Sequence, residues 1–175
     1  MNCSNFPSKN YLDWCMNLLC KQPDENGNGE VPQISCDVGY IYRLEGNDFV
    51  IFDEGENIEF QNAIVRGGIG FNPNSPADIT INTPGVYKVT FYLNCQSRSI
   101  VAIQLNSQTV LPQHTYKNNA ASQFIYGQAL IEVTNPNTTL TIHVLKDVTL
   151  DKTQQNEPQS VNASVLIKRV CALNH

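Results

Sequence analysis

Charged residues are scarce in this chain: they make up 15% of its 175 residues, against about 25% in a typical globular protein. The chain has no cluster of lysine or arginine, and its formal net charge of -5 would repel a phosphate backbone. The composition therefore argues against a nucleic-acid partner. A hydrophobic share of 41% at this length predicts one domain of ordinary size with a full core.

Long apolar runs are also missing. A membrane-spanning helix needs about 20 consecutive apolar residues, and no segment comes near that length. We therefore predict no membrane insertion. The start of the chain, residues 1–7, lacks the basic region and the apolar stretch of a secretory signal. A route out of the cell, if one exists, is expected to differ from signal-directed secretion.

The patterns of common catalytic sites are absent as well. The three histidines, His114, His143 and His175, lie far apart, and the chain has no His-x-His pair, Gly-x-Ser-x-Gly elbow or phosphate-binding loop. We predict that the protein is not an enzyme and has no cofactor and no metal site. Residues 53–59 form the one acidic cluster, which would suit calcium, but a solvated acidic loop is the favoured interpretation.

The six cysteines are unevenly placed, with four of them in the first 36 residues. Zinc is disfavoured because Cys15 and Cys20 have no nearby histidine and no Cys-x-x-Cys pair occurs. Disulfides, within or between chains, are the favoured interpretation, and buried or idle thiols are the remaining alternative. The candidate disulfide cysteines are Cys3, Cys15, Cys20 and Cys36.

The N-terminal segment predicts a short tail, helical or extended, that is distinct from the rest of the chain. Tyr11, Trp14, Leu18 and Leu19 recur at the spacing of an amphipathic helix of about three turns, which is too short to be stable alone. Its apolar side must therefore dock on something. Residues 23–30 then read as a linker rich in Asn and Gly. We assign residues 1–38 to this tail and linker, and residues 39–175 to a head domain.

The head domain shows the period-two alternation of β-strands. Tyr87, Val89, Phe91 and Leu93 share one face of a predicted strand, and residues 140–144 and 161–167 repeat the pattern. Turn clusters rich in Asn, Pro and Gly separate eight to ten such segments at roughly even spacing. The sequence therefore predicts an all-β, antiparallel β-sandwich or barrel.

Four of these segments also resemble a known family. Residues 79–91 resemble the strand with an apolar-turn-Gly-x-Tyr motif in the tumour necrosis factor and complement globular-head superfamily. The heads of BclA-type collagen-like glycoproteins of bacterial spores are more similar still. Residues 101–112 resemble their strand in which Leu-Asn-Gly is followed by an apolar pair and Pro. Residues 122–131 resemble their strand with Ser-Gln followed by Gly-Gln and an apolar residue, and residues 161–167 resemble their closing Val-Asn-Ala-Ser-Leu strand. The resemblance covers about residues 39 to 170.

The resemblance implies a trimeric jelly roll without catalytic activity. It implies a structural role at the spore surface, in the exosporium layer or an appendage fibre, for a protein made without a signal peptide in the mother cell. The expected partners are further copies of the chain and other spore-coat or exosporium proteins. The aromatic residues expected to form the core and the trimer contacts are Tyr87, Phe91, Tyr92, Phe124 and Tyr126.

The chain also departs from this family. It has ten glycines without a period of three, so the collagen stalk is absent, as is the family's Pro- and Leu-rich targeting segment. The cysteine-containing tail stands in their place and resembles the short connectors that join jelly-roll subunits in spore appendages. The alternative function is a trimeric head that binds a carbohydrate or a receptor through loops such as the polar residues 146–160.

Overall fold

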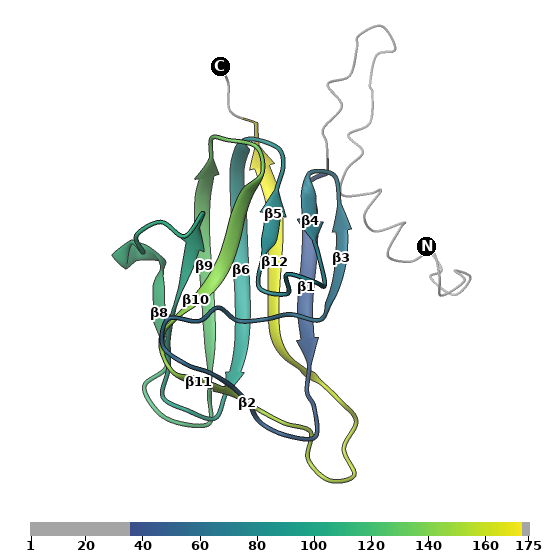
Figure 1. Ribbon diagram of the computed structural model, residues 1–175, viewed down its shortest axis with the longest axis vertical. Helices are drawn as coiled ribbons and strands as arrows, with labels where there is room; N and C mark the ends of the chain where they lie inside the picture. The colour runs from purple at the N-terminus through teal and green to yellow at the C-terminus, as the bar shows by residue number, and fades with distance from the viewer. Residues whose placement is uncertain (1–35, 173–175) are drawn as a thin grey trace, which may run out of the picture. The chain divides into compact units, whose positions relative to one another are not determined.

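The computed structural model describes residues 36–172, which form a β-sandwich of twelve strands (Figure 1). One short 3-10 helix, η1 (Pro112–His114), is the only helical element in this part of the chain. The strands are β1 (Val38–Leu44), β2 (Val50–Phe52), β3 (Asn62–Arg66), β4 (Ile69–Phe71), β5 (Ile79–Ile81), β6 (Gly85–Cys95), β7 (Ile100–Leu105), β8 (Thr115–Lys117), β9 (Gln123–Val133), β10 (Thr138–Lys146), β11 (Val148–Leu150) and β12 (Val161–Cys171).

The strands pair into two antiparallel sheets. Sheet A has seven strands in the order β2-β11-β6-β12-β1-β3, and β9 pairs with β6; sheet B has five in the order β4-β5-β10-β7-β8. Neighbours in the sheets are often distant in the sequence, as in the pairs β1–β12 and β5–β10. Two antiparallel sheets whose neighbouring strands come from distant parts of the sequence form the jelly-roll arrangement. It confirms the predicted fold class.

The number of strands exceeds the eight to ten predicted. Several of the strands, including β2, β4 and β11, are only three residues long. A segment of this length is too short to display alternation in the sequence, so only pairing with a neighbour identifies it as a strand.

The core lies between the two sheets, and the central strand β6 supplies much of it. Tyr87, Val89, Phe91 and Leu93 are each no more than 1% exposed, and all four lie on one face of the strand. Burial of such side chains stabilises the fold by about 1.5–3 kcal/mol each. Sheet B covers them with the buried side chains of Ile79, Ile81, Val101, Ile103, Leu140, Ile142 and Val144.

Phe91 is closely packed within the core, at 1% exposure. Its ring meets the ring of Tyr116 edge to face, with 5.0 Å between centroids and an interplanar angle of 83°. Gly127 is its direct partner across the β6–β9 ladder, and a Cβ atom at that position would overlap the Phe91 ring. Gly127 therefore makes room for the aromatic side chain.

A buried carboxylate fastens the start of the head domain. Asp37 is 2% exposed, and its oxygens accept a hydrogen bond from the Gly68 amide at 2.6 Å and pair with the Arg169 guanidinium at 3.4 Å. The Tyr87 hydroxyl lies 3.4 Å from the same carboxylate and donates to the Thr83 carbonyl oxygen at 2.7 Å. The cluster links β6, β12 and the residue that precedes β1.

This cluster also bears on where the head domain begins. The contacts divide the chain between Cys36 and Asp37, two residues before the predicted boundary, because Asp37 is already part of the packed unit and Val38 begins β1. The expected helix at residues 8–21 and the linker at residues 23–30 lie outside the described residues.

Phe91→Ala is expected to lower the free energy of unfolding by about 3–5 kcal/mol, because it leaves a cavity beside Gly127 and Tyr116. Urea denaturation followed by fluorescence measures the change. Phe49→Ala is the control: this ring is 46% exposed, so its loss should cost about 1 kcal/mol or less. A loss below about 1 kcal/mol for Phe91→Ala would mean that β6 pairs one residue out of register.

Tyr87→Phe is expected to change the alkaline stability of the head domain. Burial, reinforced by the Asp37 carboxylate, raises the pKa of Tyr87 to about 12, whereas an unfolded tyrosine titrates near about 10. The folded state thus holds this proton more tightly. Its contribution to stability is complete below about pH 10 and is lost as the pH rises to about 12.

The variant should therefore lose stability less steeply than the parent across that pH window. It should also be weaker by about 1 kcal/mol near neutral pH, since the Thr83 carbonyl loses its donor. Urea midpoints at a series of alkaline pH values measure both effects. Tyr126→Phe, on an exposed side chain, serves as the matched control. Identical alkaline slopes for the parent and Tyr87→Phe would contradict the assignment.

Candidate functional site

The candidate site is the outer face of sheet A, which we define as the side of β9, β6, β12, β1 and β3 that points away from the core. The registers place its side chains in rows across the strands. One row runs Tyr126, Tyr92, Ser164, Tyr42 and Asn62, and the next runs Gln128, Thr90, Leu166, Tyr40 and Ile64. The outer face therefore carries aromatic and aliphatic side chains where an isolated sandwich would carry polar ones.

Several of these apolar side chains are largely open to solvent. Phe124 and Tyr126 are each 62% exposed and Leu130 is 65% exposed, all on β9. Leu166 on β12 and Ile64 on β3 continue the surface across the sheet, at 46% and 39%. Large exposed apolar side chains gathered on one face, between polar ones such as Gln128 and Thr90, mark a site of association in a protein.

Aromatic pairs stiffen the outer face. Tyr92 packs against Phe124 with 5.3 Å between ring centroids, and Tyr40 stacks on Tyr42 at 5.2 Å with an interplanar angle of 20°. Burial is the main cause that raises the pKa of Tyr92, followed by its nearby acidic groups, first the Glu45 carboxylate, then the Cys95 thiol and the Asp151 carboxylate. The rings thus form a preorganised apolar surface rather than scattered side chains.

The five aromatic residues predicted from the sequence divide between two environments. Tyr87 and Phe91 lie in the core, whereas Tyr92, Phe124 and Tyr126 lie on the outer face. Sequence reasoning missed Tyr40, Tyr42, Leu130 and Leu166. The signal was available: in an alternating strand, an apolar residue at the polar position predicts an apolar outer face.

The described cysteines differ in accessibility. Cys36 is half-buried at the start of the described residues, Cys171 is an exposed free thiol, and Cys95 is a free thiol in the core. Burial raises the pKa of Cys95 to about 12, so its thiolate is not populated near neutral pH. Cys3, Cys15 and Cys20, together with the predicted apolar tail residues Tyr11, Trp14, Leu18 and Leu19, lie outside the described residues.

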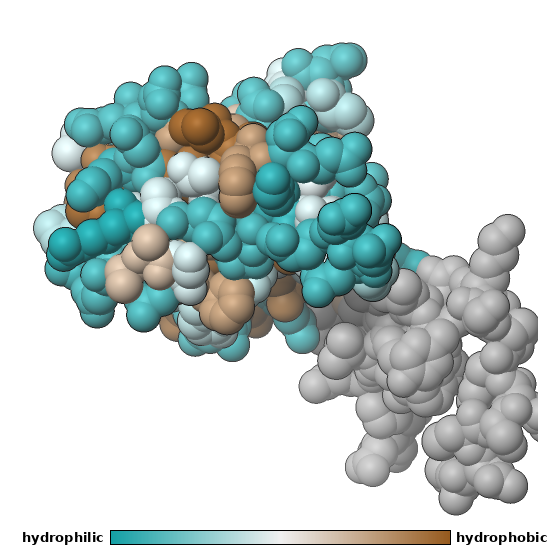
Figure 2. Space-filling model, turned by 90° about the horizontal axis from the view of Figure 1, so that it is seen from below, coloured by the Kyte–Doolittle hydropathy of each residue, from teal (hydrophilic) through white to brown (hydrophobic). Residues whose placement is uncertain are grey.

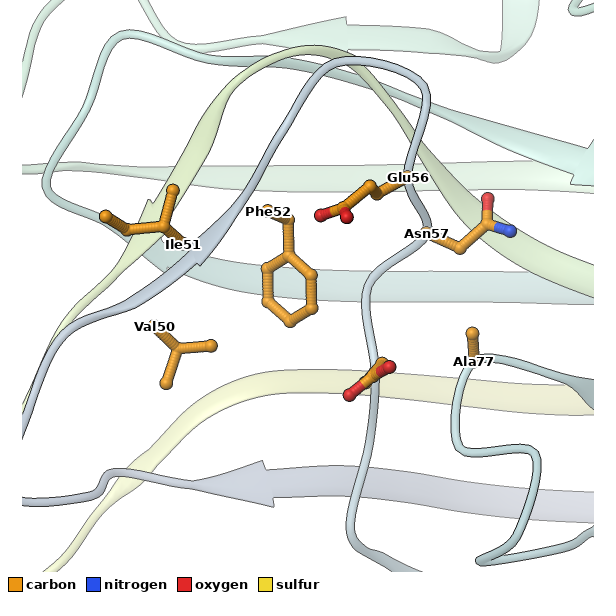
Figure 3. Close-up of a pocket in the computed structure, with 7 residues that line it drawn as sticks. Val50, Ile51, Phe52, Glu56, Asn57 and Ala77 are labelled. Atoms are coloured by element: carbon orange, nitrogen blue, oxygen red, sulfur yellow. The ribbon is translucent and has the colours of Figure 1, made fainter.

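The acidic cluster at residues 53–59 borders a hollow of about 510 Å³ beside β2 (Figure 3). Figure 3 places Phe52 between Val50 and Ile51 on one side and Glu56, Asn57 and Ala77 on the other. The Glu56 carboxylate accepts a hydrogen bond from the Asp53 amide, and the Asn57 side-chain oxygen lies 2.9 Å from Nδ1 of His143. No group of three metal-ligating side chains gathers within residues 36–172.

A second hollow, of about 500 Å³, is lined by Asn47 and residues 152–157 of the long polar loop. Lys152 extends over the exposed ring of Phe49, with its Nζ 4.7 Å from the ring centroid. Figure 2 views the end of the molecule that carries β2 and this loop, where apolar side chains form separate patches among hydrophilic ones. Neither hollow is lined by as many large exposed apolar side chains as the outer face of sheet A carries.

Within the described part of the chain, no helix has both the length and the hydropathy that a membrane span requires.

Comparison with known proteins shows the fold of the head. No protein-family model matches the chain, and no curated protein matches its sequence. Solved structures do match. The globular domain of zebrafish complement 1qA aligns with a TM-score of 0.55 and 14% identity, over 79% of this chain and 99% of that one. Eiger TNF from S. frugiperda aligns at 0.57 with 7% identity, over 81% and 96%.

Murine APRIL gives a similar result, with a TM-score of 0.53, 8% identity, and coverage of 77% of this chain and 99% of that chain. At such identities the similarity establishes the fold alone. The head of this protein has the jelly-roll fold seen in the tumour necrosis factor and complement 1q globular heads.

Proposed function

We propose that this protein is a non-enzymatic structural subunit of the bacterial spore surface, in the exosporium layer or an appendage fibre. It self-assembles through trimeric jelly-roll heads and through its N-terminal tail. Its partners are further copies of itself and other spore-coat or exosporium proteins. The spore location rests on the sequence resemblance to BclA-type heads.

The outer face of sheet A carries the self-association part of the proposal. Tyr126, Leu130 and Leu166 are large, exposed and aligned by the strand register. Covering apolar surface stabilises an assembly by about 25 cal/mol for each Å² removed from water. A second and a third copy supply a matching apolar surface, because each carries the same outer face. A closed symmetric arrangement limits the assembly to a fixed number of copies.

The tail supplies the second contact in this proposal. Cys95 and Cys171 are free thiols, so a disulfide of Cys36 would take its partner from Cys3, Cys15 or Cys20, in the same chain or in a neighbouring one. Such a bond would form after exposure to an oxidising environment, since a reducing cytosol keeps thiols free during synthesis. The competing arrangement is a tail that folds back on its own head.

The isolated head, residues 36–175, is expected to give three times its monomer mass by light scattering at low micromolar concentration. Phe124→Glu together with Tyr126→Glu should reduce the mass to that of a folded monomer, because these positions face Asn94 and Tyr92 across the ladder, and a buried carboxylate without a cation costs several kcal/mol. Leu111→Glu, at an exposed leucine that precedes η1 on the sheet B side, should leave the mass unchanged. A head that is monomeric without any substitution would contradict the trimer.

Deletion of residues 1–30 is expected to abolish fibres or layers while the trimer remains intact. The deletion removes the apolar stripe of Tyr11, Trp14, Leu18 and Leu19 that would dock on a neighbouring head. Negative-stain electron microscopy and light scattering measure the two properties. Unchanged assembly after the deletion would exclude the connector role and favour a tail that caps its own head.

Replacement of Cys3, Cys15 and Cys20 together by Ser separates covalent from apolar docking. Assemblies of this variant should form but should dissociate in hot detergent without reductant, whereas those of the parent should persist. Equal resistance of the two would mean that the tail cysteines do not cross-link the assembly.

A trimeric head that binds a carbohydrate or a receptor is the second candidate. The hollow lined by Asn47 and residues 152–157 favours it, because amide side chains there present paired donors and acceptors of the kind that sugar hydroxyls require. Discrete soluble trimers that enrich one glycan from an array would support this function. Fibres or sheets without such enrichment support the structural one.

A further inference from the structure

Two lysines lie side by side on the outer face of sheet A. Lys88 of β6 and Lys168 of β12 are direct partners in the antiparallel register, and both side chains are exposed. Directly opposed residues have Cα atoms about 4.5–5.5 Å apart, so the two ammonium groups can reach the same small volume. Like charges directly opposite one another destabilise a sheet when no group of opposite charge lies between them.

The neighbours of this pair on its own row do not neutralise it. Leu130 flanks Lys88 on β9, Val38 flanks Lys168 on β1, and Arg66 of β3 ends the row. Neither lysine makes an ion pair with a carboxylate of residues 36–172.

Acidic groups on the same face are few. Among the outward positions of the five strands, Glu132 at the end of β9 is the acidic one, opposite Val86 and one row beyond Lys88. The carboxylates of Glu45 and Asp151 lie near Tyr92 and not near the lysine pair. Tyr92 is four residues from Lys88 along β6, which corresponds to about 13 Å between the two residues. The outer face therefore carries an excess of positive charge at the end where β1 begins, whether or not Arg66 is counted.

Self-association amplifies this excess. Every copy brings the same Lys88, Lys168 and Glu132, so pairing between copies leaves the positive surplus of the outer faces in place, and three copies carry three times that surplus. Association also removes water from the ammonium groups, and an uncompensated buried charge costs several kcal/mol. An anion that neutralises these lysines would therefore favour closure of the trimer.

We propose that Lys88 and Lys168 bind a small multivalent oxyanion of the phosphate class, and that this anion promotes closure of the trimer. The inference deepens the proposed function and rests on the trimer that it names. Each ammonium group offers three donors, and a phosphate offers several acceptor oxygens at the spacing of two adjacent lysines. The flanking Leu130 and Val38 restrict the site to a compact ligand rather than an extended acidic peptide.

Sedimentation velocity of the full chain, kept in reductant, tests the proposal with inorganic pyrophosphate as the probe. Sodium chloride at the same ionic strength is the reference, so that general screening is held constant. Pyrophosphate should lower the concentration at which half of the chains are trimeric by about tenfold or more. Lys88→Gln with Lys168→Gln should trimerise without pyrophosphate and should lose the response, because the repulsion and the site disappear together.

Lys117→Gln with Lys146→Gln is the matched control. It removes the same charge from exposed positions outside the outer face of sheet A, and it should respond to pyrophosphate as the parent does. Equal trimer formation by the parent in both salts would overturn the anion site and leave the proposed trimer standing. An undiminished response in Lys88→Gln/Lys168→Gln would do the same. Absence of trimers in every buffer would overturn both the proposed function and this inference.

Discussion

The pairing register of β6 is the constraint on which the rest of the head depends. This strand pairs along its whole length with β9, and residues 86–93 pair on the other side with β12, so that most of β6 is held in place by two ladders. Its inward positions carry Tyr87, Val89 and Phe91, and its outward positions carry Lys88 and Tyr92. A slip of one residue would bury the lysine and expose the aromatic core, at a cost far above the stability of a small domain.

The same register produces the surface on which the proposed function rests. Because side chains alternate strictly across a strand, fixing Phe91 inward also fixes Tyr92 outward and aligns it with Tyr126 of β9. The backbone of the outer face is thus fixed by the same ladders that fix the core, although solvent reaches its side chains. An assembly that forms on this face therefore loses little backbone entropy on binding.

The cluster around Asp37 connects this sheet to the point where the tail begins. Its carboxylate holds Gly68 and Arg169, and the backbone amide of Arg169 donates to the Asp37 carbonyl oxygen at 2.9 Å. The residue that follows Cys36 is therefore buried and fixed.

The sequence by itself determined the class of fold and the inward face of β6, because the period-two pattern of Tyr87, Val89, Phe91 and Leu93 is a local property of the chain. The tail assigned to residues 1–38 stays a prediction. Only the tertiary structure decided that Tyr40, Tyr42, Leu130 and Leu166 share one surface, that Lys88 stands opposite Lys168, and that Asp37 pairs with Arg169. Each of these depends on which strands become neighbours and in which register. That choice is made by long-range packing between segments many residues apart, and one sequence carries no local record of it.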